Sequence, residues 1–195
     1  IITTFVEPVL YLLSFGYGLG SIVGSIDSGH GTLTYRQFVF AGIVGQSVLF
    51  QSFFEAAYGG FIRMYYQRIF KAISTTPITL SEVLWGELLW DASKATFGAG
   101  AVLLIGMITG DFDSLGALCC LPLCFFSALL FSGLGLWVAS LSQSIDQISY
   151  PQYLLIFPMF LFCGVFFPLN QLPHGLQIIA AFLPLSAVLS LVRTL

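Results

Sequence analysis

The stretch RMYYQRIFKAISTTPITLSEVLWGE, residues 63–87, is a polar island in a chain that is otherwise almost entirely apolar. Five of the fifteen charged residues of the protein lie within these 25 positions. A charged segment between two apolar segments predicts a water-exposed connection between two membrane-spanning helices. The charged residues of the polar island are Arg63, Arg68, Lys71, Glu82 and Glu87.

The composition of the whole chain predicts a membrane protein. Hydrophobic residues make up 57% of the 195 residues, charged residues make up 8%, and the mean hydropathy is +0.96. A soluble domain carries about 25% charged residues, so this chain cannot cover a water-facing surface and its main solvent must be lipid. The net charge of −3 and the six basic residues argue against nucleic acid as a partner, because no basic patch exists to neutralise phosphates.

Hydropathy divides the chain into apolar segments of about 20 residues, which predicts an all-α polytopic membrane domain. The segment 176–195 is apolar but interrupted by Pro184, so it can be a sixth span or two short half-helices that enter the membrane and return. Because the chain starts without Met and is already apolar, we expect it to be part of a longer protein. The five expected spans are residues 1–23, 38–62, 84–108, 115–141 and 150–167, the last kinked near Pro158.

The distribution of Lys and Arg predicts which side of the membrane each connection faces. Arg63, Arg68 and Lys71 follow the second expected span, whereas the connection after the third span has no basic residue. Basic residues concentrate on the cytoplasmic side of membrane proteins. We therefore expect residues 63–94 and 141–150 to be cytoplasmic, and residues 25–36, 110–114 and 168–175 to face outward.

The first part of the polar island predicts a helix that continues the second span beyond the membrane. Arg63, Gln67 and Lys71 are spaced four apart, so in a continuous helix they would share one polar face. Glu55 precedes Arg63 by eight residues, about 12 Å along such a helix, which is too far for a direct ion pair. We therefore expect Glu55 to pair with another helix or to face the cytoplasmic vestibule.

The second part of the polar island predicts a helix end followed by a new helix start. Pro77 disfavours helix at Thr76 and ends the first helix there. Thr79 and Glu82 have the spacing of a capping box, which predicts the start of the next helix. A rigid connection of this kind is suited to docking on a soluble partner. The alternative is an ordinary solvated hairpin whose positive charges only set the topology.

A few polar residues lie in or near the apolar segments. Glu87, Asp91 and Lys94 are spaced at i, i+4 and i+7, so they give the start of the third span a polar face. Glu7, near the start of the first span, is expected at the membrane boundary rather than in a transport role. No metal site is expected, because the His and Asp residues of the outer loops lack ligand spacing. The cysteines Cys119, Cys120, Cys124 and Cys163 are expected to be small packing residues.

Three stretches, in order, carry a resemblance: EPVLYLLSFGYGLG (7–20), FEAAYGGFIRMYYQRIFKAISTTPITLSEVLWGELLW (54–90), and PQYLLIFPMFLFCGVFFPLNQLP with the trailing LPLSAVLSLVRTL (151–195). With them, the chain resembles the membrane subunit of an ABC exporter of the ABC-2 type. The nodulation lipo-oligosaccharide and drug-export permeases are the branches that it resembles most. The resemblance covers essentially the whole chain, and the order of the stretches makes it specific.

The resemblance implies a homodimeric permease of the bacterial inner membrane, with six spans per subunit and a cytoplasmic ATPase subunit on each half. It implies a transport subunit rather than an enzyme, which exports an amphipathic molecule such as a lipo-oligosaccharide, a lipid-linked glycan or a hydrophobic drug. Residues 172–195 would form two re-entrant helices on the outer side, broken at Pro184, and the sixth span and an N-terminal interface helix would lie outside this sequence. The ATPase-coupling element carries over onto residues 72–82, and the expected coupling residues are Arg63, Arg68, Lys71, Ala72, Thr75, Thr76, Pro77, Ile78, Thr79 and Glu82.

ATP and Mg²⁺ are expected on the partner ATPase, because this chain has no G-x-x-x-x-G-K-[ST] loop to hold phosphates. The 20 Phe, 8 Tyr and 3 Trp residues are numerous enough to line a path for an amphipathic substrate. The residues that the family arrangement places on this path are Phe5, Tyr11, Phe15, Glu55, Tyr153 and Phe157.

Two other classes of function are weighed against the exporter. An ion-coupled secondary transporter or channel would need polar residues and broken helices near the membrane midplane, whereas the breaks at Pro168, Pro173 and Pro184 lie at one end. An intramembrane lipid-modifying enzyme would need converging His, Asp or Glu side chains, and apart from the polar start of the third span the spans supply only Glu7 and Glu55.

Overall fold

The computed structural model describes residues 10–19, 25–27, 32–110, 114–169 and 173–194. Nearly all of these residues are helical, and several segments are π-helical, denoted η. The elements in chain order are η1 Leu12–Leu19, β1 Ser25–Asp27, β2 Thr32–Thr34, α3 Tyr35–Phe54, η2 Glu55–Gly59, η3 Ile62–Tyr66, α4 Ile69–Ile73, α5 Leu80–Thr109, α6 Ser114–Leu141, α7 Ile145–Pro151, η4 Gln152–Ile156, α8 Phe157–Phe162, α9 His174–Phe182 and α10 Pro184–Thr194.

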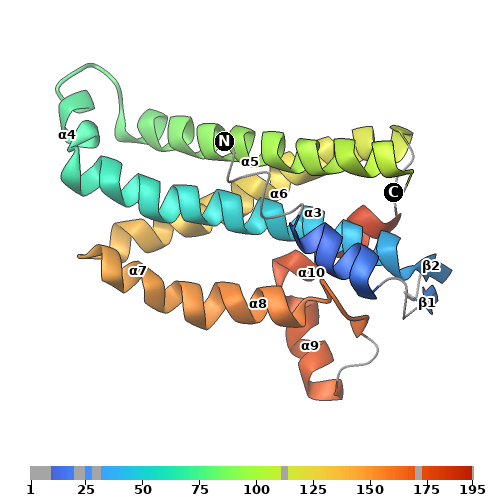
Figure 1. Ribbon diagram of the computed structural model, residues 1–195. Helices are drawn as coiled ribbons and strands as arrows, with labels where there is room; N and C mark the ends of the chain where they lie inside the picture. Colours follow the sequence, from blue (N-terminus) through green and yellow to red (C-terminus); the bar gives the residue numbers. More distant parts are fainter. Residues whose placement is uncertain (1–9, 20–24, 28–31, 111–113, 170–172, 195) are drawn as a thin grey trace.

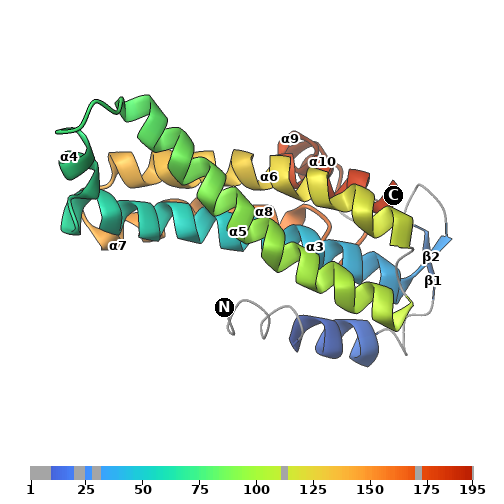
Figure 2. The ribbon, with the colours of Figure 1, turned by 90° about the horizontal axis from the view of Figure 1, so that it is seen from above.

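The long helices lie side by side and form an elongated bundle (Figures 1 and 2). The polar island forms one end of the bundle around α4, and the strands β1 and β2 lie at the other end (Figure 1). Helices α5 and α6 pack along one side of α3, and α7, η4 and α8 run back along the other side (Figure 1). The shorter helices α9 and α10 lie beside the strand end of α3.

Helix α3 is the centre of the bundle, and most of its residues are buried, including the polar Gln46 and Ser52. Together with η2 and η3 it forms one helical rod, 35–66, and 78% of its most apolar part is buried. The corresponding parts of α5 and α6 are only 39% and 44% buried, since each packs with one side and exposes the other. The fully buried side chains of the rod include Phe38, Phe40 and Phe53.

Two glycines let the neighbouring helices approach this rod closely. A Cβ atom at Gly135 of α6 would lie 2.7 Å from the carbonyl oxygen of Phe53, and one at Gly106 of α5 would lie 2.5 Å from the ring of Phe40. Small residues at such crossings let helix backbones pack closely within a membrane. The two contacts therefore set the positions of α5 and α6 against the rod.

The structure confirms helices at the second, third and fourth expected spans, each with slightly extended ends. The helices run over 35–66, 80–109 and 114–141, and the second of them ends at Gly110, which has a left-handed φ of 77°. These three are the described helices that are long and apolar enough to cross a membrane, or up to four if the bent pair α9–α10 counts as one span.

The first and fifth expected spans differ from the expectation. Most of the first span lies outside the described residues, and its described part is helical over 10–19. The fifth begins at Ile145, five residues before the expected start, and ends at Phe162. Its early end has a local cause, because Gly164 takes a left-handed φ of 83° that a helix cannot continue through. The irregularity expected at Pro158 precedes that residue as the π-helical segment η4.

Helices α9 and α10 meet at an angle of 86°. The Ser186 hydroxyl lies within 2.6 Å of the carbonyl oxygens of both Ala180 and Leu183, at the corner between the two helices. At the far end of α10, the Arg193 guanidinium donates to the Gly164 carbonyl and lies 3.6 Å above the Phe38 ring. These contacts tie the bent pair to α3 and to the end of α8.

The segment between the first and second expected spans contains a short hairpin. Strands β1 and β2 pair antiparallel, with Ser25 opposite Thr34 and Asp27 opposite Thr32. Helix α3 begins directly after β2, where the Thr34 N–H donates to the Gln37 side chain at 3.3 Å. The hairpin is the one strand structure among the described residues of this otherwise helical chain.

Candidate functional site

The polar island turns through residues 67–82, which we call the elbow and which include the first turn of α5 (Figure 1). The rod ends where the Gln67 N–H donates to the Ile62 carbonyl at 2.9 Å, and Arg68 then takes a left-handed φ of 52°. Non-glycine residues rarely adopt this conformation, and here it redirects the chain into α4. The expected continuous helix with Arg63, Gln67 and Lys71 on one face is therefore wrong, because the backbone breaks between the first and the last of them.

Three consecutive hydroxyl groups lie at the C-terminal end of helix α4. The side chains of Ser74, Thr75 and Thr76 each donate to the backbone carbonyl three residues earlier, at 2.8, 2.7 and 2.5 Å. Two of these carbonyls, those of Ala72 and Ile73, also accept hydrogen bonds from the backbone N–H groups of Thr75 and Thr76, so the last turn of the helix is well satisfied. The helix stops at Ile73, before the position expected from Pro77.

The restart of the helix at Thr79 is confirmed. Thr79 has extended backbone, and the Glu82 carboxylate accepts hydrogen bonds from the Thr79 N–H at 2.8 Å and from the Thr79 hydroxyl at 2.9 Å. Glu82 thus reaches back to the residue before the helix, as the capping-box spacing predicts. The carboxylate also lies at the helix N-terminus, where the helix dipole favours negative charge.

The tip of the elbow combines exposed apolar and polar side chains. Ile78 is 48% exposed and Leu80 is 62% exposed, although both are large apolar residues. Because these two apolar side chains are surrounded by polar residues, they form a small candidate surface for binding a partner. The expected coupling residues that are exposed here are Arg68, Lys71, Ala72, Thr75, Thr76, Pro77, Ile78, Thr79 and Glu82.

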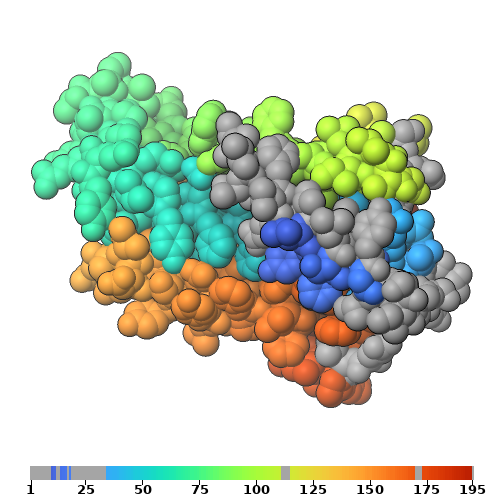
Figure 3. Space-filling model, viewed as in Figure 1, coloured from blue at the N-terminus to red at the C-terminus, as the bar shows by residue number. Residues whose placement is uncertain are grey.

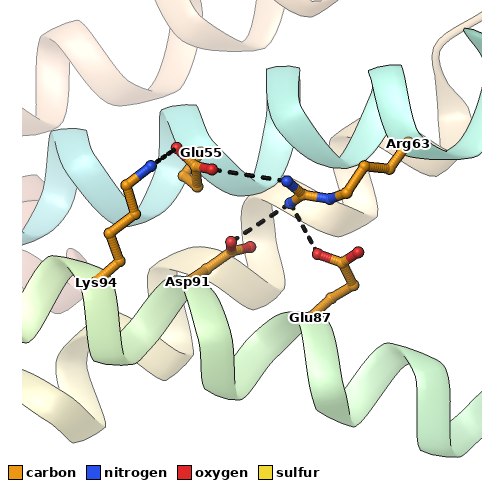
Figure 4. Close-up of polar contacts among 5 residues, drawn as sticks. All are labelled: Glu55, Arg63, Glu87, Asp91 and Lys94. Carbon is orange, nitrogen blue, oxygen red and sulfur yellow. Dashed lines mark hydrogen bonds and ion pairs between the residues drawn. The ribbon is translucent and has the colours of Figure 1, made fainter. Parts of the chain in front are cut away.

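Behind the elbow, five charged side chains from two helices meet in what we call the ion-pair cluster (Figure 4). The Arg63 guanidinium lies 2.8 Å from the Glu87 carboxylate, 3.5 Å from Asp91 and 3.6 Å from Glu55. The Lys94 ammonium lies 2.6 Å from the other oxygen of Glu55. Asp91 is fully buried and Glu87 is 13% exposed, so water screens these pairs less than it screens surface pairs.

The pairing of Glu55 with Lys94 confirms the expectation that Glu55 reaches another helix. The expectation that Glu55 and Arg63 are too far apart to interact is wrong, for two reasons. Helical side chains tilt toward the N-terminus, so the long Arg63 side chain extends back toward Glu55. Residues eight apart in an α-helix are also about 80° out of phase, but the wider turn of η2 lies between these two and reduces that angle.

The ion-pair cluster places Arg63 differently from the other expected coupling residues. Its side chain lies between the rod and α5 and is only 21% exposed, where it borders the same pocket as Ile78 and Glu82 (Figure 4). The spacing of Glu87, Asp91 and Lys94 correctly indicates a polar face on α5. Spacing along one helix could not reveal that this face is directed at Arg63 and Glu55.

Four of the residues expected on the substrate path belong to one chain of aromatic rings. The stacked pair Tyr11 and Phe15 is joined to the stacked pair Tyr153 and Phe157 through rings that the sequence did not single out. Glu55 lies apart from this chain, in the ion-pair cluster, and Phe5 lies outside the described residues. The rings follow one another in the order Tyr11, Phe15, Phe166, Phe160, Phe50, Phe157 and Tyr153. The distances between the centroids of successive rings along this order are 6.1, 4.5, 5.5, 5.1, 6.0 and 5.5 Å.

The part of the chain that the structure describes contains no group of three or more His, Cys, Asp or Glu residues that could hold a metal ion. Three of the four cysteines, Cys120, Cys124 and Cys163, are buried among apolar side chains, and Cys119 is exposed. His174 is exposed at the start of α9. Glu7, Asp111 and Asp113 lie outside the described residues.

Comparison with known proteins adds to this geometry. The family model described as ABC-2 type transporter matches residues 1–195. Nodulation protein J of Rhizobium leguminosarum bv. viciae is 36% identical over 187 residues, which cover 96% of this chain and 71% of that protein. Nodulation protein J of Rhizobium meliloti (strain 1021) is 34% identical over 96% of this chain and 70% of that protein. The inner membrane transport permease YadH of Escherichia coli (strain K12) is 25% identical over 97% of this chain and 73% of that protein. No solved structure matches the chain.

Proposed function

The chain belongs to the ABC-2 type transporter family. On that premise we propose that it exports an amphipathic molecule, and that an ATPase subunit docked on the elbow drives this export. Members of this family are membrane components of exporters that work with an ABC ATPase, so the chain is a transport component rather than an enzyme. A lipo-oligosaccharide is the first substrate to test, because the relatives with the highest identity given above are nodulation proteins.

The observation that carries this proposal is the construction of the elbow. A solvated hairpin that only sets topology needs no defined shape. Here three hydroxyls bond to the carbonyls at the end of one helix, Glu82 caps the next, and Ile78 and Leu80 are exposed at the start of that second helix. A rigid tip with an apolar centre and a polar rim is suited to a cleft in a soluble subunit.

In the proposed mechanism, the ATPases bind ATP and Mg²⁺ and close, and their closure pushes on the elbow. The push tilts the rod and α5, which shifts the pore between two arrangements. Two copies of this chain and two ATPase subunits form the working exporter in the bacterial inner membrane. The elbow, within residues 63–94, and the α6–α7 connection, within residues 141–150, face the cytoplasm.

We propose five spans and two re-entrant helices for the described topology. The spans are the helix that includes η1, the rod, α5, α6, and the combined α7–η4–α8 helix. The bend of 86° between α9 and α10 and the hydrogen bonds at its corner support the re-entrant arrangement, since a straight span would need neither. Residues 172–195 would then lie at the outer side of the membrane, with the break at Pro184.

The chain of aromatic rings is the proposed wall of the substrate path. It joins the first span to the fifth across the face of α3, and Tyr153 at one end is 66% exposed. Rings of this kind can stack against the apolar parts of an amphipathic molecule without demanding one fixed orientation. Glu55 is not part of the proposed path, because both of its oxygens are paired in the ion-pair cluster.

The test is reconstitution of the exporter with Ile78→Glu, which places a charge at the apolar centre of the elbow tip. We expect this variant to lose complex formation with the ATPase, or to leave ATP turnover uncoupled from transport. The matched control is Gln143→Glu, which adds the same charge at an exposed position at the same end of the molecule. Unchanged complex formation together with unchanged transport in Ile78→Glu would refute the docking role of the elbow.

A further inference from the structure

The ion-pair cluster lies at the boundary between the packed core and the elbow. On the core side, Ala92, Ala95 and Ala99 of α5 are fully buried against their neighbours. On the elbow side, the described segment η3 has no buried side chain, and Tyr66 and Trp85 are more than half exposed. Between these two regions, ion pairs rather than apolar packing join the rod to α5.

The pairs cross between the two helices in both directions. Arg63 belongs to the rod and pairs with Glu87 and Asp91 of α5, whereas Lys94 belongs to α5 and pairs with Glu55 of the rod (Figure 4). On α5 the outermost charged partners, Glu87 and Lys94, are seven residues apart, about 10 Å along the helix axis. On the rod, Glu55 lies within ion-pair distance of both Lys94 and Arg63, so the pairs form one connected network. A network anchored at several positions on each helix opposes both pivoting and sliding of one helix against the other.

The local backbone also favours this arrangement. The π-helical segments η2 and η3 contain or adjoin the two rod residues of the cluster, with Glu55 opening η2 and Arg63 lying in η3. π-Helical turns are rare in proteins, and those that do occur are often found at functional sites. By changing the number of residues per turn, η2 brings Glu55 and Arg63 closer to one face of the rod, the face directed at α5.

We propose that the ion-pair cluster makes the rod and α5 move together as one rigid body when the elbow is pushed, so that Arg63 acts as a positioning residue for transport. This inference rests on the proposed function, because it assumes that the ATPase acts through the elbow. Without the cluster, a push on the elbow separates the two helices instead of tilting both, and ATP turnover moves less substrate.

The first arm of the test measures the two helices directly and does not depend on transport. Spin labels are attached at Tyr66→Cys and Trp85→Cys in the reconstituted chain, in a background without the four native cysteines. Arg63→Gln is expected to broaden the distance distribution between the labels, and Arg63→Lys to broaden it less. The matched control Arg68→Gln removes the same charge from the exposed elbow and should leave the distribution unchanged. An unchanged distribution in Arg63→Gln would overturn the proposal.

The second arm measures transport per ATP hydrolysed in the complex with the ATPase. Arg63→Gln is expected to lower this ratio about fivefold while complex formation persists, which corresponds to the lower end of typical coupling energies. If the distance distribution broadens but the ratio is unchanged, the cluster has no part in coupling and the proposal fails. Glu87→Gln removes the partner charge of Arg63 and tests the same link if Arg63→Gln does not fold. If the wild-type chain binds no ATPase, the proposed function fails, and the spin-label arm still decides whether the cluster holds the helices together.

Discussion

At the scale of single residues, Asp91 is a fully buried carboxylate, and the free energy required to bury it depends on the charges of its neighbours. Its carboxylate accepts no hydrogen bond from the described residues, and Arg63 lies 3.5 Å away. Removing one partner of a buried ion pair destabilises the fold strongly, because the other charge stays buried and uncompensated. Replacing both partners together changes the stability little. The stability of this region therefore depends on Arg63 more than on the exposed basic residues of the elbow.

This dependence predicts different effects for single and double variants. Arg63→Met should lower the free energy of unfolding by about 3 kcal/mol, because it leaves the Asp91 carboxylate without a compensating charge. Adding Asp91→Asn should recover at least half of that loss. The measurement is unfolding of the purified protein in detergent, followed by circular dichroism. If the double variant is less stable than Arg63→Met alone, the buried charge is not the source of the loss.

At the scale of elements, the ends of the helices are decided by short-range polar contacts. The start of α5 at Thr79 was predictable, because Glu82 lies three residues later and reaches back locally. The start of α4 was not, because it depends on the left-handed backbone of Arg68, and its end at Ile73 comes before the position indicated by Pro77. Neither feature has a strong pattern in the sequence.

The corner between α9 and α10 gives a prediction at this scale. Ser186→Ala should lower the stability of the corner by about 1 kcal/mol, since the hydroxyl shared by the Ala180 and Leu183 carbonyls is lost. Limited proteolysis of the reconstituted protein should then cut more readily near residue 183. Ser190→Ala is the matched control, because that hydroxyl bonds within its own helix, to Ala187. Equal protease sensitivity of the two variants would show that the Ser186 hydroxyl does not hold the corner.

At the scale of the whole molecule, the bundle separates the end that carries the elbow from an end that carries the hairpin and the bent helix pair (Figure 1). The space-filling view shows the elbow at one end and the orange-red residues of the bent pair toward the other (Figure 3). If the elbow is cytoplasmic, the exposed start of α9 must lie toward the other side of the membrane. The proposed topology thus fixes the accessibility of both regions.

Cysteine labelling in intact cells measures this sidedness. A membrane-impermeant maleimide should label His174→Cys in intact cells and Thr75→Cys only after lysis, in a background without native cysteines. Both positions are exposed, so burial does not decide the result. Labelling of Thr75→Cys from outside would reverse the orientation inferred from Arg63, Arg68 and Lys71.

The aromatic chain gives a second prediction for the whole molecule. Phe166→Ala removes the ring that joins Phe15 to Phe160, so transport should fall about fivefold, as an aromatic contact is worth about 1 kcal/mol. Phe126→Ala on the exposed side of α6 is the control for general loss of a ring. The readout is the initial transport rate at constant complex formation with the ATPase. Equal rates in both variants would remove this ring from the substrate path.

Composition and local spacing determined the class of the protein, because a chain with 8% charged residues can bury its surface only in lipid. The three long helices and the restart at Thr79 also follow from patterns that act within one helix. Only the tertiary structure showed that Arg63 turns inward, and that Phe50, Phe160 and Phe166 connect two distant aromatic pairs. Those contacts join residues far apart in sequence, so they depend on how the helices pack and on where η2 changes the phase of the rod. Spacing along the chain carries no information about either.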